Sequence, residues 1–120
     1  MSILKFSRSQ EAAQQMLVLF LRKGIFRIPV DSIRCLQKEG RKLWIVYDGG
    51  RVSHYGKLDE VEAALPEYFC RCHHSTVVNL RRVVRLEGNR FHLETGEVVA
   101  ISQRRGAQVR RAYLRFLEEI

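Results

Sequence analysis

Three clusters of polar side chains in this sequence could reach a ligand. They share a position at the expected end of a strand or in a turn, where long side chains project from a rigid frame. The clusters are residues 38–42 with Arg41 and Lys42, residues 71–75 with His74 and Ser75, and residues 102–105 with Arg104 and Arg105. Arginine pairs bidentately with guanine edges and with phosphates, whereas lysine offers a point charge. These residue types indicate a polyanionic ligand.

Each cluster also has a purely structural interpretation. Charged turns such as the one at Arg41 and Lys42 are often only solvated. Ser102 could cap the terminal helix with its hydroxyl group. In a regular strand His73 and His74 would point to opposite faces, so that one of them packs inward.

The charge of the whole chain favours the same ligand class. The 120 residues include 21 Lys and Arg, 16 of them Arg, against 13 Asp and Glu, which gives a formal net charge of +8. Residues 99–117 contain five arginines and no acidic residue. A nucleic acid is the first expectation for such a balance, and an anionic membrane surface is the second.

Other chemistry has less support. The segment Cys70 to His74 contains thiol and imidazole groups that zinc prefers, but its spacing lacks a second, distant ligand pair. A redox switch through Cys70 and Cys72 is a further alternative. No Gly-rich phosphate loop, H-E-x-x-H or G-x-S-x-G motif occurs. We therefore expect no enzyme, no cofactor, no metal and no small-molecule substrate, and the odd number of cysteines suggests a reducing cytoplasm.

The elements that must hold these clusters are mostly strands. Residues 9–15 are expected to form a short helix followed by a strand, although 17–21 and 25–28 can also be read as a hairpin. The predicted strands are 33–37, 43–47, 52–55, 76–79, 82–86, 91–94 and 98–101. A short helix runs from Leu58 to Leu65 and stops at Pro66, and the apolar stripe from Val109 to Ile120 predicts a terminal helix. The interpretation is one mainly β domain over 1–120, with no signal peptide and no membrane-spanning run.

The ordered motifs resemble the LytTR domain, the DNA-binding output module of bacterial response regulators in two-component systems. They are Ile28-Pro29-Val30-Asp31-Ser32-Ile33, Glu39-Gly40-Arg41-Lys42, Gly56-Lys57-Leu58, Phe69, Arg71 to Asn79, Gly96-Glu97, Val99 and Ser102-Gln103-Arg104-Arg105. The resemblance covers residues 25–112 and leaves 1–24 as an N-terminal extension. No phosphoacceptor domain precedes it, so we expect a stand-alone member or an excised output domain.

The resemblance implies an elongated, antiparallel β structure whose loops enter successive major grooves from one side. By this comparison Arg41 or Lys42 enters one groove, His74 with Ser75 contacts DNA at the centre, and Arg104 with Arg105 enters the other groove. His73 and Asn79 are expected to be structural. The family often has Arg or Asn at the position of His74, which bears on base preference at that contact.

The expected function is sequence-specific binding of double-stranded promoter DNA, at direct repeats by family analogy, with a homodimer on DNA as one form. The alternative is a regulatory interaction module that binds a membrane inhibitor or another partner protein through the apolar residues 16–21. A membrane-surface protein is a third option, disfavoured because the arginines are spread over loops.

Overall fold

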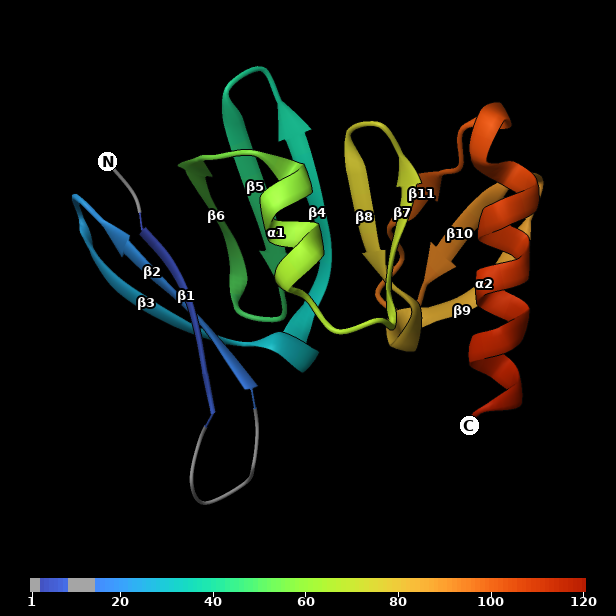
Figure 1. The fold of residues 1–120 in the computed structure, drawn as a ribbon, viewed down its shortest axis with the longest axis horizontal. Coiled ribbons are helices and arrows are strands. Elements are labelled where there is room, and N and C mark those ends of the chain that lie inside the picture. The colour runs from blue at the N-terminus through green and yellow to red at the C-terminus, as the bar shows by residue number, and fades with distance from the viewer. Residues whose placement is uncertain (1–2, 9–14) are drawn as a thin grey trace.

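The computed structural model describes the backbone of residues 3–8 and the whole of residues 15–120. Within these ranges the strands form three antiparallel sheets, accompanied by two α-helices and three short 3-10 turns (Figure 1). This mainly β architecture with a short middle helix and a C-terminal helix confirms the predicted fold class.

The N-terminal sheet consists of β1 (Ile3–Arg8), β2 (Gln15–Leu21) and β3 (Gly24–Pro29), in that order. Strands β2 and β3 pair in a hairpin from Met16–Pro29 to Leu21–Gly24, with Arg22 and Lys23 in the turn. The strand expected after residues 9–15 is therefore confirmed. The alternative interpretation, in which 17–21 and 25–28 form a hairpin, is confirmed as well. The helix expected at 9–15 lies outside the described residues except for Gln15, which is already in β2.

The central sheet has the order β6-β5-β4-β8-β7. Its strands are β4 (Ile33–Glu39), β5 (Lys42–Tyr47), β6 (Gly50–Tyr55), β7 (Phe69–His73) and β8 (Thr76–Asn79). The 3-10 turn η1 (Val30–Ser32) leads into β4, and helix α1 (Leu58–Ala64) connects β6 to β7. Gly40 closes the β4–β5 turn at φ 61°, a conformation that glycine adopts without steric cost.

The third sheet has the order β11-β10-β9 and is covered by the terminal helix. After the 3-10 turn η2 (Leu80–Arg82) come β9 (Val83–Glu87), β10 (Arg90–Leu93) and β11 (Val98–Ala100). The turn η3 (Gln103–Arg105) then leads into α2 (Gly106–Glu118). The predicted terminal helix is confirmed through Glu118, but Ile120 lies beyond it and is exposed, so the apolar stripe ends earlier than expected.

Two apolar cores meet at β7 and β8. The first core lies between the N-terminal sheet, α1 and the central sheet and includes Leu17, Leu36 and Val77. The second lies between β7–β8, the third sheet and α2 and includes Cys72, Val78 and Phe91. Because neighbouring strand residues point to opposite faces, Val77 and Val78 enter different cores. The β7–β8 hairpin is therefore a wall shared by both halves of the protein.

None of the helices in the described part of the chain is long and apolar enough to span a bilayer.

Candidate nucleic-acid interface

Three turns lie along one edge of the molecule, the upper edge in Figure 1. They are the β4–β5 turn (residues 39–42), the β7–β8 turn (residues 73–76) and the η3 region (residues 102–106). Two backbone hydrogen bonds join them: Lys38 N–H donates to Ser75 O at 2.8 Å, and Ser102 N–H donates to Cys72 O at 2.9 Å. We call this surface the three-turn edge. Clusters that are more than 25 residues apart in the sequence are thus held in one row.

The β4–β5 turn presents Arg41 and Lys42, which are both exposed. Lys38 supports this turn from behind, because its ammonium group donates to the carbonyl oxygens of Arg41, at 3.5 Å, and of Gly56. The Lys42 ammonium lies 5.9 Å from the centre of the Trp44 ring. The turn is braced at its base and leaves two cations at its tip.

The β7–β8 turn is held by Arg71, whose side chain is only 16% exposed. Its guanidinium donates to the carbonyl oxygens of His73, at 2.9 Å, and His74, at 2.5 Å. The same group pairs with Asp59 at 2.7 Å and Glu62 at 2.8 Å, both on α1. The hydrogen bond from Arg71 lowers the pKa of the Asp59 carboxyl group. One arginine therefore fixes the turn and neutralises acidic groups close to this edge.

The two histidines are arranged differently from the sequence expectation. His73 ends β7 and His74 already lies in the turn, so strand alternation does not separate them, and their ring centres are 4.3 Å apart. His73 Nδ1 lies 2.8 Å from Ser75 Oγ and accepts the Ser75 N–H at 3.2 Å. His74 is exposed, whereas His73 and Ser75 are half-buried. At this turn His74 is the side chain that a ligand could reach most directly.

Asn79 is a structural residue at the far end of β8. It is fully buried, and its amide group donates to Ile33 O at 2.8 Å. Its carbonyl oxygen accepts the N–H of Arg81 at 2.9 Å. The side chain thereby joins β8, β4 and η2.

The η3 region presents an exposed Arg104 and a half-buried Arg105. The expected capping role of Ser102 is wrong for its side chain, which makes no capping hydrogen bond. Its backbone carbonyl accepts the N–H of Arg105 at 3.0 Å, while its hydroxyl oxygen is buried without a hydrogen-bond partner in the described structure. The backbone closes this turn, and the hydroxyl group adds nothing to it.

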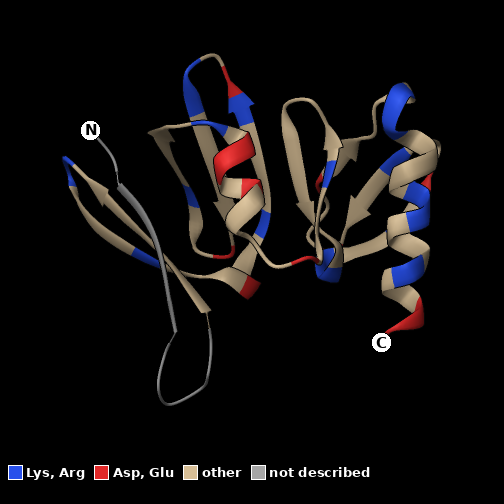
Figure 2. Ribbon diagram, viewed as in Figure 1, with Lys and Arg blue, Asp and Glu red and all other residues tan. Residues whose placement is uncertain are grey.

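Ion pairing divides the arginines into two groups. The arginines that pair with carboxylates are Arg34, Arg71, Arg81, Arg82 and Arg85. Over residues 15–120, the four cations of the three-turn edge form no ion pair; these are Arg41, Lys42, Arg104 and Arg105. Figure 2 shows basic residues at both ends of this edge. The edge therefore has positive charge that an external anion could neutralise.

The opposite edge has a dense network of internal pairs. Asp48, in the β5–β6 turn, accepts from Arg34 at 3.2 Å and from Arg82 at 2.7 Å. Arg34 also pairs with Glu97 at 2.5 Å, and Arg82 pairs with Glu94. The hydrogen bond from Arg82, assisted by Arg34, lowers the pKa of Asp48. At this edge, Arg34 and Arg82 are therefore neutralised by carboxylates of the same chain.

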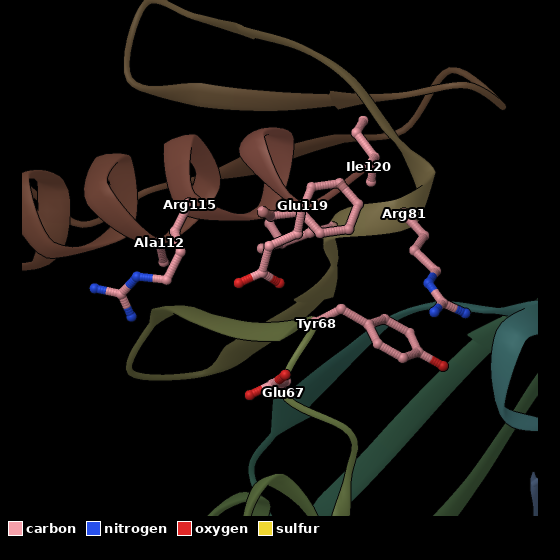
Figure 3. Close-up of a pocket in the computed structure, with 9 residues that line it drawn as sticks. Glu67, Tyr68, Arg81, Ala112, Arg115, Glu119 and Ile120 are labelled. Atoms are coloured by element: carbon pink, nitrogen blue, oxygen red, sulfur yellow. The ribbon is translucent and has the colours of Figure 1, made fainter.

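A cavity of about 260 Å³ also lies away from the three-turn edge, between α2 and the beginning of β7 (Figure 3). Tyr68 and Arg81 line it, with the Arg81 guanidinium 3.9 Å from the centre of the Tyr68 ring. Both groups are engaged with Asp31, since the Tyr68 hydroxyl donates to it at 2.5 Å and Arg81 pairs with it at 2.9 Å. Tyr68 and Arg81 thus connect η1 to η2 and to the segment just before β7.

The cysteines are free thiols with raised pKa values. Burial raises the pKa to about 12 for Cys35 and Cys72 and to about 11 for Cys70. Thiolates, which zinc binding and disulfide exchange require, are disfavoured in these surroundings. Within the described residues no group of three or more His, Cys, Asp or Glu side chains is placed to hold a metal ion.

The apolar segment 16–21 is not a free docking surface. Met16, Leu17 and Leu19 are buried, and the last two belong to the first core. Val18, Phe20 and Leu21 are half-buried, so only part of each of these side chains is accessible to a partner.

Two features of the edge and its surroundings differ from the sequence prediction. The sequence predicts Arg71 within a cluster of candidate ligand contacts, but its partners on α1 make it a support for the turn. Arg22 and Lys23, in the β2–β3 turn, are exposed cations that the family motifs do not indicate as contacts. Their position in a tight turn between two apolar runs was the available signal.

Comparison with known proteins identifies the family and a solved structure with the same fold. The model of the LytTr DNA-binding domain family matches residues 23–113. Among solved structures, the LytTr DNA-binding domain of a putative methyl-accepting/DNA response regulator from Bacillus cereus has a similar fold, with a TM-score of 0.73 at 23% sequence identity. The match covers 81% of this chain and 94% of that one. A search of curated proteins gives no match.

Proposed function

Because this chain belongs to the family of LytTr DNA-binding domains, we propose that it recognises specific sequences in double-stranded DNA through the three-turn edge. It would act as the DNA-binding domain of a bacterial transcriptional regulator in the cytoplasm. The observation that carries the proposal is the row of three braced turns whose outer cations form no ion pair with any residue of 15–120. A rigid row of this kind suits a long, regular polyanion.

Each turn would contact a different part of the DNA. Arg41 or Lys42 would enter one major groove, and Arg104 with Arg105 would enter the next one. His74 would contact the DNA between them, with Ser75 beside it. An arginine that pairs bidentately with guanine contributes about 1–3 kcal/mol of discrimination between bases.

The size of the molecule fits two neighbouring grooves only if the duplex bends. Its longest axis is 39 Å, and the three turns are distributed along this axis (Figure 1). Successive major grooves on one side of B-DNA are about 34 Å apart. Since the turns occupy only part of the axis, bending the duplex towards the protein would bring both grooves within reach of the outer turns.

Binding from one side also suits direct repeats. Each copy would occupy one repeat in the same orientation, as a monomer or as a homodimer assembled on the DNA. An inhibitor protein that covers the three-turn edge would compete with DNA and so regulate the domain. Residues 1–24 would form an N-terminal extension of the same domain.

The test is Arg104→Ala, measured on sites first selected from a random pool of duplexes. The loss of a bidentate base contact of about 1–3 kcal/mol should weaken binding roughly 5- to 150-fold and relax the preference at one base pair. Quantitative binding to the selected site and to its single-base variants measures both effects.

Arg115→Ala is the matched control, because Arg115 is exposed on α2 and forms no ion pair in the described residues. Equal affinity and equal base preference in the Arg104 variant and the control would contradict the role of Arg104. Selection that enriches no sequence would contradict specific recognition altogether.

A further inference from the structure

A second basic surface lies beside the β4–β5 turn. It surrounds a cavity of about 310 Å³ that is lined by Arg22 and Lys23 of the β2–β3 turn and by Lys42. Ser53 and Tyr55 of β6 also line this cavity. Lys42 thus belongs both to the three-turn edge and to this cavity, so the two surfaces are continuous.

The charges around this cavity have one sign. Its lining contains three cations and no carboxylate among the described residues. Arg22, Lys23 and Lys42 form no ion pair within residues 15–120; Lys23 lies 5.5 Å from the ring centre of Phe26, and Lys42 lies over Trp44. Gathering like charges costs free energy, which an anion in the cavity would offset.

From this arrangement we infer that the β2–β3 turn and Lys42 bind a phosphate of the DNA backbone, outside the segment that the three turns contact. The inference rests on the proposed DNA binding and adds a fourth contact to it. The cations suit a phosphate, and Ser53 supplies a hydroxyl donor.

The contact would lie beyond the outer end of the recognised sequence. The β2–β3 turn is on the far side of β6 and β5 from the β7–β8 turn (Figure 1). A duplex that follows the three-turn edge past Lys42 would meet this turn next if it bends towards the protein. The contact therefore requires flanking DNA on the Lys42 side, and as a phosphate contact it should be independent of sequence.

The experiment compares the wild-type chain with Arg22→Ala/Lys23→Ala on two duplexes that carry the selected site. One duplex extends about one helical turn past the site on the Lys42 side, and the other ends at the site on that side. Affinity is measured over a series of salt concentrations. Each phosphate contact steepens the log–log salt dependence by about 0.9.

On the long duplex the double variant should bind several-fold more weakly, with a salt slope shallower by about 1. On the short duplex it should match the wild type, and its base preference should be unchanged on both. Arg111→Ala/Arg115→Ala removes the same charge from exposed positions of α2 and should show no dependence on flank length. Arg22→Gln/Lys23→Gln keeps long polar side chains and should reproduce the loss if charge is the cause.

Equal slopes for the wild type and both β2–β3 variants on the long duplex would overturn this inference while leaving the proposed function intact. A changed base preference in the double variant would also overturn it, because it would indicate base contact. If the wild-type chain shows no sequence preference, the proposed function fails first, and this inference fails with it.

Discussion

Arg71 connects the stability of the protein to the presentation of its ligand-facing turn. Its guanidinium spans two carboxylates of α1 and two carbonyl oxygens of the β7–β8 turn. Arginine can do this because its five donors point in fixed directions in one plane. A support of this kind acts on the ligand only through the position of His74.

Arg71→Ala should therefore lower both stability and DNA affinity. The loss of charge-assisted hydrogen bonds at a largely buried site predicts about 1–3 kcal/mol of destabilisation, measured by urea unfolding. Arg71→Lys retains the charge but cannot span both sets of oxygens, so it should recover only part of the loss. Full recovery by lysine in both measurements would show that charge alone matters here.

Ser102 offers the opposite case, a polar group whose removal should cost little. Its hydroxyl oxygen is buried and lacks a hydrogen-bond partner in the described structure. Ser102→Ala should leave the free energy of unfolding unchanged or raise it by up to about 1 kcal/mol, since the alanine chain avoids burying an unpaired hydroxyl. A loss of about 1 kcal/mol or more would instead reveal a capping or water-mediated role.

At the level of elements, Asp48 links the β5–β6 turn to two other parts of the chain through its side chain. It joins the β5–β6 turn to β4 through Arg34 and to η2 through Arg82. Its pKa is lowered in the folded protein, so folding favours the ionised carboxylate. This contribution to stability is present above the ordinary aspartate pKa of about 4 and is lost as the pH falls through the lowered value.

Asp48→Asn should accordingly be less stable than the wild type at pH 7, and the difference should shrink as the pH falls below about 4. Unfolding by urea at a series of pH values between 2 and 7 measures it. Glu60→Gln is the control, because Glu60 is exposed on α1 and forms no ion pair in the described chain. A wild-type-to-Asp48→Asn difference that stays constant over this range would contradict the linkage.

The sequence predicts strands correctly where short apolar-rich runs are bounded by clear turn signals. Gly40 and the Asp48-Gly49-Gly50 turn separate short apolar-rich runs, and the sequence predicts the corresponding strands β4, β5 and β6. Strand β7 was not predicted as an element, because the pairing register shifts between Arg71 and His73 and breaks the alternation of buried residues. The continuous apolar run in β2 fitted helical spacing equally well, and only pairing with β1 and β3 resolves it.

At the level of the whole molecule, the site depended on information that no single segment carries. The cations near residues 41 and 104 could be identified as ligand candidates from their type and position. Their placement on one edge results from the pairing of β4 with β8 and from the Ser102–Cys72 hydrogen bond. In the sequence itself, only the order of the family motifs indicates this placement. The fold also determines which arginines are neutralised by carboxylates from other elements. Arg71, for example, is neutralised by two carboxylates of α1.

The shared wall has a consequence for how this protein can vary. All four residues of β8 are buried, and Val77 and Val78 face different cores. An insertion or deletion of a single residue in this strand would exchange the two faces and turn each valine towards the wrong half. We therefore expect this hairpin to diversify by substitution at its exposed tip, where His74 lies, while its length stays constant.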